Sequence, residues 1–339
     1  MKKRPLGKTG LHVGELSLGG LFTSSLAGGT SETIRILPRA IELGINYVDT
    51  APAYADSEAT LGTALASVSE PLVLSTKLGG RPQPFDARDT AALRESFEES
   101  LRLLGRKRVE LLLIHEPDRP QQYDWWTNQE RAEGPVIDLL LELKREGLVG
   151  AIGLAGTTSS ELYHLVATGK FDVVLTAFNY NVLYREAAIE LIPTATQLGM
   201  GIIIASSLGQ GFLARRFDEE VRRRPVWLAK PRQEQFAKLY AFLDDIGMSL
   251  PEIGLRFAIS HPDISTVLVG PKTTAQLEES VALVEKGPLP ANLLDRLDEI
   301  AAMVPHRPFE EPMILPFGKS YHGPGLANLG AGVPIGKTD

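Results

Sequence analysis

The chain has 339 residues, no cysteine and a net charge of −7, which excludes disulfide and thiolate chemistry and disfavours nucleic acid as a partner. A hydrophobic fraction of 43% and a charged fraction of 23% are typical of a globular protein that buries a core. The most apolar stretches, such as GIIIASSLG, fall short of the ~20 residues of a membrane helix, and no apolar signal core follows the first ten residues. We therefore expect a cytoplasmic protein without a membrane segment.

The predicted elements begin with a hairpin around Gly7 to Gly10 and then alternate strands with helices. The predicted strands are ELSLGG, NYVDT, LVLSTK, VELLLIH, GAIGLAG, FDVVLTAFN, GIIIAS and STVLVG. The helices that follow them are Ser31 to Leu43, Glu58 to Ala66, Thr90 to Leu104, Val136 to Glu146, Ser160 to Ala167, Glu186 to Leu198, Gln233 to Asp245 and Ala275 to Glu285. Eight such pairs predict an α/β protein with a closed (β/α)8 TIM barrel, in one domain over residues 1–339.

Glycines and prolines mark the ends of these elements. The glycines expected to end helices are Gly44, Gly105, Gly147, Gly199 and Gly247. Two extra helices are predicted, over Pro251 to Ser260 and Pro290 to Met303. The segment from about 305 to 339 is rich in Pro and Gly and is predicted to be irregular. It either closes over a site, with Phe309, Phe317 and Tyr321 as pocket contacts, or is a loose tail.

Four polar side chains follow apolar runs at predicted strand ends. NYVDTAPAY carries Asp49 and Tyr54, LVLSTK ends on Lys77, and VELLLIH ends on His115. In a barrel the carboxyl ends of the strands meet on one face, so these side chains are expected to converge. A phenol with a pKa near 10 needs a nearby cation to ionise, and a half-buried ammonium needs a carboxylate partner. His115 can hydrogen-bond a carbonyl oxygen.

Five motifs in one order, DTAPAYADSE, STKLG, LLLIHEPD, SSLGQGFL and GPKTTAQLEES, resemble those of the aldo-keto reductase superfamily over about Arg4 to Met303. The resemblance implies that Tyr54 is the proton donor, that Lys77 and Asp49 modulate it, and that His115 orients the substrate carbonyl. Hydride transfer requires a nicotinamide, because no side chain supplies a hydride. The implied cofactor is NADP or NAD.

The cofactor site is expected in the later barrel loops, because no GxGxxG motif opens the chain. A small-residue loop follows the seventh strand, and the exit of the eighth strand opens a helix whose amino end favours phosphate. Asp49 also borders the expected cofactor site, as do Gly20 and Leu21 at the first strand's exit. The other predicted contacts are Ser206, Leu208, Gly209, Gln210, Gly270, Lys272, Thr273, Gln276 and Glu279.

The sequence departs from the family where the nicotinamide amide is held. Many members have Ser-Asn after the fifth strand, whereas this chain has Ala155 and Gly156, with Asn179 or Thr157 as candidate replacements. The family's glutamine on the sixth strand and aromatic on the seventh correspond to Leu175 and Ala205 here. These departures are similar to the branch of L-galactose, L-fucose and other aldose dehydrogenases. A sugar or small aldehyde is therefore the expected substrate.

Two sets of residues bear on specificity. Phe22, Tyr123, Trp125 and Trp126 are candidate substrate contacts, and the last three lie in a long segment after the fourth strand whose rings stack on a sugar or simply pack. Lys272 is the only cation between residues 270 and 280, and Gln276 stands where NADP-dependent relatives often carry Arg. We therefore expect use of both NADP and NAD.

Two other functions remain open at this stage. Lys77 could form a Schiff base in a barrel aldolase, or the chain could be a non-catalytic, NADP-binding regulatory subunit. A metal is not expected, since no histidine pair has a spacing such as HxxxH. Substrate identity and oligomeric state are left open by the sequence.

Overall fold

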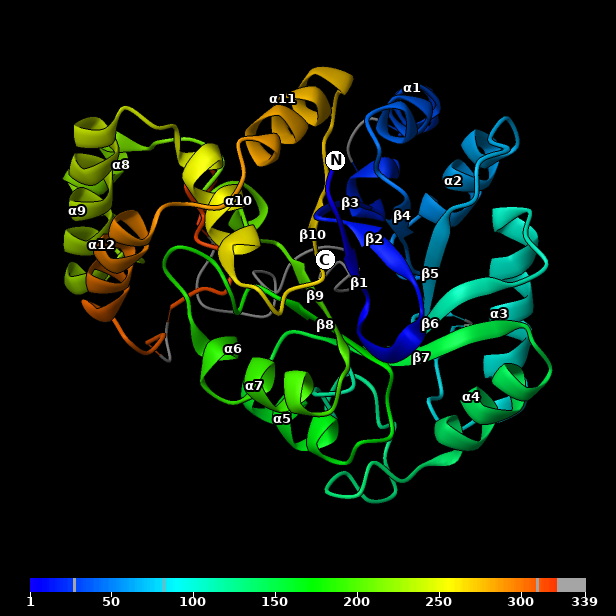
Figure 1. Ribbon diagram of the computed structural model, residues 1–339. Helices are drawn as coiled ribbons and strands as arrows, with labels where there is room; N and C mark the ends of the chain where they lie inside the picture. Colours follow the sequence, from blue (N-terminus) through cyan, green and yellow to red (C-terminus); the bar gives the residue numbers. More distant parts are fainter. Residues whose placement is uncertain (27–28, 82, 309–310, 322–339) are drawn as a thin grey trace.

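Eight parallel strands form a closed barrel in a computed structural model that describes residues 1–26, 29–81, 83–308 and 311–321 (Figure 1). Each strand pairs with its neighbour along the chain, and β10 closes the ring between β9 and β3. The strands are β3 (Leu16–Gly19), β4 (Tyr47–Asp49), β5 (Val73–Leu78), β6 (Val109–His115), β7 (Val149–Gly156), β8 (Val173–Ala177), β9 (Gly201–Ala205) and β10 (Thr266–Val269). All eight predicted strands are present, and the predicted (β/α)8 barrel is confirmed.

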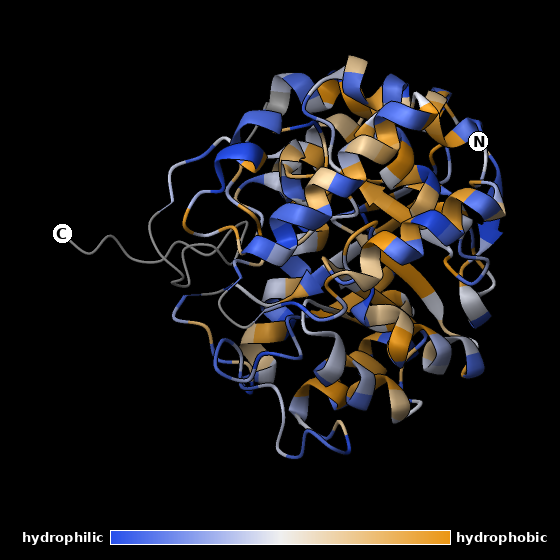
Figure 2. Ribbon diagram, turned by 90° about the vertical axis from the view of Figure 1, so that its left-hand side faces the viewer, coloured by the Kyte–Doolittle hydropathy of each residue, from blue (hydrophilic) through white to orange (hydrophobic). Residues whose placement is uncertain are grey.

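Helices surround the barrel, and hydrophobic residues concentrate on the central strands while hydrophilic residues lie mainly on the outer helices and loops (Figures 1 and 2). The α-helices are α1 (Gly29–Glu42), α2 (Ser57–Leu65), α3 (Thr90–Leu104), α4 (Pro135–Arg145), α5 (Ser159–Ala167), α6 (Glu186–Ile189), α7 (Leu191–Gln197), α8 (Asp218–Arg223), α9 (Lys230–Ile246), α10 (Leu250–Ser260), α11 (Thr274–Glu285) and α12 (Ala291–Ala302). Both extra helices, α10 and α12, are confirmed. None of the helices in the described ranges combines the length and hydropathy that crossing a bilayer requires.

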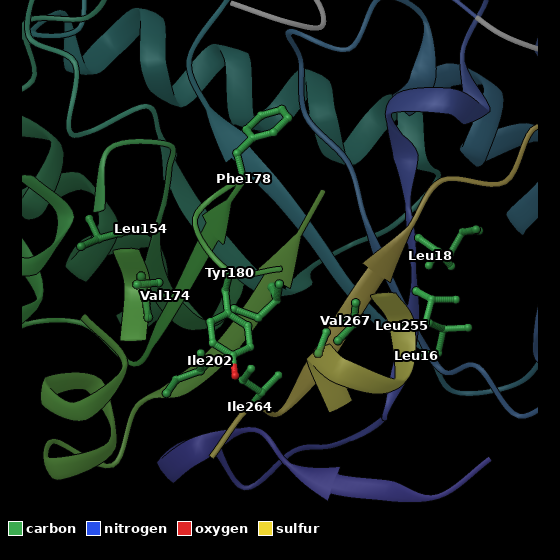
Figure 3. Packing of buried hydrophobic residues seen from close by; sticks show 14 of the residues in the cluster. Leu16, Leu18, Leu154, Val174, Phe178, Tyr180, Ile202, Leu255, Ile264 and Val267 are labelled. Atoms are coloured by element: carbon green, nitrogen blue, oxygen red, sulfur yellow. The ribbon is translucent and has the colours of Figure 1, made fainter. Parts of the chain in front are cut away.

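Alternation along the strands divides the core into two layers, because successive strand side chains point to opposite faces. The outward residues pack under the helices, as Figure 3 shows for Leu16 and Leu18 of β3 beside Leu255 of α10. The inward residues fill the barrel itself, among them Tyr47, Leu111, Leu113, Val173 and Ile203. The barrel is therefore packed along its length and can hold a ligand only at an open end.

The predicted hairpin closes the amino-terminal end of the barrel. Strands β1 (Lys3–Pro5) and β2 (His12–Gly14) pair antiparallel, and Leu6 and Val13 are fully buried in the inner layer. The Lys8 N–H donates to the carbonyl of Gly199, with a nitrogen–oxygen distance of 2.7 Å. Gly7 has a φ of 52°, and a Cβ there would lie 2.2 Å from the Gly201 nitrogen. Only the carboxyl ends of the strands remain open.

Apart from shifts of a few residues at the ends of elements, the α-helices differ from the prediction in two places. The helix expected over Glu186 to Leu198 is divided at Glu190, because Pro193 lacks an N–H and its ring would clash with the carbonyl four residues earlier. Helix α8 was not predicted, since its six residues are too few to show a helical period. The predicted helix-ending glycines all have positive φ, namely Gly44, Gly105, Gly147, Gly199 and Gly247.

Candidate active site

A cavity of about 780 Å³ opens at the carboxyl ends of the strands. Its volume lies within the range of roughly 300–1,000 Å³ that is usual for cofactor and small-molecule sites. All four polar residues predicted at strand ends line it: Asp49, Tyr54, Lys77 and His115. The structure therefore brings together side chains from three successive strands and one loop.

A buried ion pair lies at the floor of the cavity. Nζ of Lys77 donates to Oδ2 of Asp49 at 2.7 Å and to the carbonyl of Thr50 at 2.8 Å. The two side chains retain only 1% and 3% of their exposure. Lys77 is held here because β5 continues two residues beyond Ser75, which is the residue paired with Asp49. Burial lowers the Lys77 pKa, but Asp49 and Tyr54 outweigh this effect, and the pKa is raised overall.

A hydrogen-bonded chain supports this ion pair from inside the barrel. The Ser75 hydroxyl donates to Oδ1 of Asp49 at 2.6 Å, and the Tyr47 hydroxyl lies 2.9 Å from the same Ser75 oxygen. Sequence reasoning did not include Tyr47 or Ser75. Their positions could have indicated them, because each lies two residues before Asp49 or Lys77 and therefore on the same strand face.

Tyr54 lies on the loop between β4 and α2, beside the lysine. Nζ of Lys77 is 4.7 Å from the centre of the Tyr54 ring. The loop is fixed by backbone hydrogen bonds from Tyr54 N–H to Ala51 and from Ser57 N–H to Tyr54. Burial raises the pKa of the Tyr54 phenol, and the Lys77 charge offsets only part of that rise. The phenol is therefore protonated at neutral pH.

His115 completes the group from the end of β6. Its ring is edge-on to Tyr54, with 5.6 Å between the ring centres. Burial, together with the charges of Lys77 and Arg119, holds the His115 pKa well below its usual value, so the imidazole is neutral. Nδ1 is buried and has no hydrogen-bond partner in the described part of the chain. Nε2 is then the ring nitrogen available to a ligand.

Most of the predicted cofactor contacts line the same cavity. These are Gly20, Leu21, Asp49, Ser206, Leu208, Gln210, Gly270, Lys272, Gln276 and Glu279. Gly209 and Thr273 do not line it. Gly209 lies within the irregular loop after β9, where a Cβ would meet the Phe212 ring at 2.1 Å. The Thr273 hydroxyl instead accepts the Gln276 N–H as the cap of α11.

The loop after β9 and the start of α11 have the chemistry of a phosphate site. Ser206, Gly209, Gln210 and Gly211 all have positive φ, and the N–H groups of Gly209 and Gly211 donate to the carbonyls of Ser206 and Leu208 within this turn. The turn brings the side chains of Ser206 and Gln210 to the cavity. α11 begins beside Lys272, and helix amino ends favour anions. Arg215 also lines the cavity and was missed from the sequence, because it lies in a loop outside the compared motifs.

The candidates for holding a nicotinamide amide differ in position. Thr157 lines the cavity, whereas Asn179 does not. The Asn179 amide is buried and donates to the Thr157 carbonyl and the Thr176 hydroxyl. A Cβ on Gly156 would lie 2.2 Å from Oδ1 of Asp118, so the absence of a side chain there makes room for this carboxylate.

The three aromatic residues of the β6–α4 loop pack locally and lie outside the cavity. Trp125 and Trp126 are buried, and their indole nitrogens donate to the carbonyls of His115 and Pro117 at 3.0 and 2.7 Å. Tyr123 is half-buried and packs against Trp125 and Phe85. None of the three lines the cavity. Of the two alternatives for Tyr123, Trp125 and Trp126, stacking on a sugar or local packing, the structure therefore favours packing, whereas Phe22 does line the cavity.

The C-terminal segment forms part of the cavity wall through Leu315, Phe317, Gly318 and Lys319. It is anchored by Glu311, which accepts hydrogen bonds from Nε and Nη2 of the buried Arg232 at 2.6 and 2.8 Å. The described part of the segment therefore closes beside the site. Tyr321 does not line the cavity, and Phe309 lies outside the described residues.

No group of three or more potential metal-ligating side chains occurs among the residues that the structure describes.

Comparisons with known proteins identify the family of this chain. The profile of the Aldo/keto reductase family matches residues 15–302. L-galactose dehydrogenase of Arabidopsis thaliana is 29% identical over 293 residues, which cover 83% of this chain and 87% of the relative. D-threo-aldose 1-dehydrogenase of a Pseudomonas species is 28% identical over 324 residues, which cover 87% of this chain and 94% of the relative.

A solved structure shows the same fold. The holo form of an aldo-keto reductase from Bacillus halodurans superposes with a TM-score of 0.70 at 25% identity, covering 89% of this chain and 96% of that one. Together with the family match over most of the chain, this likeness settles the identity. The chain belongs to the aldo/keto reductase family and is an NAD(P)-dependent oxidoreductase.

Proposed function

We propose that this enzyme interconverts a carbonyl and an alcohol, or an aldose and its lactone, with a sugar or small aldehyde as substrate and NADP or NAD as cofactor. The observation that carries the proposal is the convergence of the Asp49–Lys77 ion pair, the Tyr54 phenol and the neutral His115 in one cavity. The names of the L-galactose and D-threo-aldose dehydrogenase relatives support a sugar.

Each side chain has a distinct role in this proposal. Tyr54 donates a proton to the carbonyl oxygen during reduction and accepts it back during oxidation. Lys77 favours the phenolate through its charge, and Asp49 keeps Lys77 protonated and in place. The neutral His115 donates from Nε2 to the same oxygen and thereby orients the carbonyl.

The cavity residues fit a nicotinamide dinucleotide, which supplies or accepts the hydride when bound. The turn after β9 brings Ser206, Leu208 and Gln210 to the cavity, where the Ser206 hydroxyl and the Gln210 amide can donate to a pyrophosphate. Lys272 and Gln276, at the start of α11, line the part of the cavity suited to the adenosine end. Lys272 is a single point charge, so it favours a 2′-phosphate only weakly. Use of both cofactors is therefore expected.

The two alternative functions receive less support. A Schiff-base aldolase needs a neutral lysine amine, whereas Lys77 is ion-paired and has a raised pKa. A regulatory subunit would have no need for a buried ion pair beside a phenol and a neutral imidazole. Because burying an ion pair costs free energy, its presence favours a catalytic role.

A cofactor-coupled absorbance screen tests the proposal. The enzyme is offered aldoses and small aldehydes with reduced NADP or NAD, and aldoses with the oxidised forms. Turnover on at least one carbonyl supports the proposal. Cofactor binding without any turnover would favour the regulatory subunit, and borohydride trapping of substrate on Lys77 would favour the aldolase.

A further inference from the structure

The four-residue constellation leaves one carboxyl group in the cavity without a role. Glu116 directly follows His115 and lines the cavity. Its backbone has a φ of 49°, which side-chain-bearing residues seldom adopt, and its N–H donates to the Ala155 carbonyl at 2.7 Å. A strained backbone held by a neighbouring strand is typical of a residue positioned for function.

The two carboxyl oxygens of Glu116 differ in their surroundings. Oε2 accepts a hydrogen bond from the Thr157 hydroxyl at 2.8 Å and lies 3.3 Å from Nε of Arg119. Oε1 makes no hydrogen bond with the part of the chain that the structure describes, and it is not fully buried. The side chain keeps 15% of its exposure. Oε1 is therefore the oxygen that a ligand in the cavity can reach.

The electrostatic surroundings make the charge of Glu116 variable near neutral pH. Burial, and then the Asp118 carboxylate, raise the Glu116 pKa to about 7, against the lowering effects of Arg119, Thr157 and Lys77. The remaining titratable groups that face it are Tyr54, Tyr123 and His115, of which the first two have raised pKa values and the third is neutral. The charge of Glu116, which lies beside the reacting groups, therefore changes near neutral pH.

Asp118 fixes the other side of this arrangement. Its Oδ2 accepts the N–H groups of Thr157, at 2.8 Å, and of Thr158. Those bonds hold the loop that carries the Thr157 hydroxyl against Glu116. The free oxygen of Glu116 is therefore presented by a built hydrogen-bonded frame and not by a mobile surface side chain.

We propose that Glu116 is a specificity residue that binds a hydroxyl group of the substrate and disfavours substrates carrying a carboxylate. This role rests on the proposed function. A hydroxyl donates to Oε1 whether or not the carboxyl is ionised. An alkyl aldehyde leaves that oxygen without a partner, which is unfavourable in a desolvated site. An anionic substrate meets like charge once Glu116 is ionised. The site then selects uncharged, polyhydroxylated aldehydes.

The pH dependence gives the proposal a distinctive signature. With a pKa of about 7, roughly a tenth of Glu116 is ionised at about pH 6 and nine tenths at about pH 8. The preference for an aldose over the matching uronate, whose carboxylate stays ionised throughout, should rise several-fold over this range. The preference for an aldose over an unsubstituted aldehyde should change little.

The test compares the wild-type enzyme with Glu116→Gln and with Glu130→Gln, an exposed residue of the same β6–α4 loop that provides a matched loss of charge. The kcat/KM values for an aldose, its uronate and an unsubstituted aldehyde are measured between about pH 6 and 8. In parallel, calorimetry measures binding of an alditol and the matching aldonate to the cofactor-loaded protein, so one readout does not need turnover.

We expect Glu116→Gln to lose the pH-dependent discrimination and to bind or use the anionic ligand about tenfold better at pH 8 than the wild type does. Glu130→Gln should match the wild type. Unchanged discrimination in Glu116→Gln, with turnover intact, would overturn the role of Glu116 and leave the proposed function standing. If no carbonyl is turned over but the calorimetric difference persists, the proposed function fails and the carboxyl subsite remains.

Discussion

The Lys77 ammonium lies 4.7 Å from the centre of the Tyr54 ring. The same nitrogen is 2.7 Å from a carboxylate oxygen of Asp49. One cation therefore neutralises a buried acid and also favours ionisation of a neighbouring phenol. Stability and catalysis are coupled at this residue, and the two effects can be measured separately.

Lys77→Met is expected to destabilise the fold by about 3–5 kcal/mol, because it leaves the Asp49 carboxylate buried without its cation. Adding Asp49→Asn should restore part of the loss, since an amide can still accept the Ser75 hydroxyl without carrying charge. Urea denaturation of the two variants measures this. Equal stabilities for the single and double variants would show that the unpaired charge of Asp49 is not the cause of the lost stability.

Lys77→Met should also move the alkaline rise of the oxidation rate to higher pH. Lys77 lowers the Tyr54 pKa, so its removal raises the pH at which the phenolate forms. Rate profiles from about pH 7 to 11 measure the shift. A profile that stays at the wild-type position, or moves to lower pH, would exclude this electrostatic account.

Glu116→Gln is expected to stabilise the protein more at pH 8 than at pH 4. Folding raises the Glu116 pKa from 4.5 to about 7, so the unfolded chain ionises first and wild-type stability falls as pH rises between these values. Each pH unit is worth about 1.4 kcal/mol, which gives a gain of up to about 3 kcal/mol for the neutral variant. Denaturation curves at the two pH values measure it, and a pH-independent difference would contradict the raised pKa.

Lys272→Ala should weaken NADP binding by less than about tenfold and leave NAD binding unchanged, because an exposed point charge contributes about 1 kcal/mol or less. Fluorescence titrations with both cofactors measure the effect. The NADP preference should also shrink in high salt, since exposed charges are screened. Equal losses for NADP and NAD would show that Lys272 does not contact the 2′-phosphate.

The barrel could be predicted because its strands carry long apolar runs and its helices end at glycines. The α6–α7 break and α8 could not, since both depend on a few residues whose effect is local. The convergence of Asp49, Lys77 and His115 also followed from the sequence, because parallel strands place their carboxyl ends on one face.

The parts of the site that escaped prediction depend on tertiary packing. The tryptophans of the β6–α4 loop looked available for stacking, but the sequence did not reveal that the carbonyls of His115 and Pro117 accept their indole N–H groups. Glu116 reads as an ordinary exposed acid beside His115. Its role depends on a hydrogen bond from Thr157, which directly follows β7 and lies 41 residues later in the chain.

The central claim is that this enzyme transfers hydride to a carbonyl with Tyr54 as proton donor. The most direct measurement follows deuterium from a labelled reduced nicotinamide into the alcohol product by mass spectrometry, with Tyr54→Phe and the matched Tyr163→Phe as variants. We predict labelled product from the wild type and Tyr163→Phe, and at least about 10² less from Tyr54→Phe with cofactor affinity unchanged. Unlabelled product, or labelling by Tyr54→Phe within tenfold of the wild type, would contradict the account.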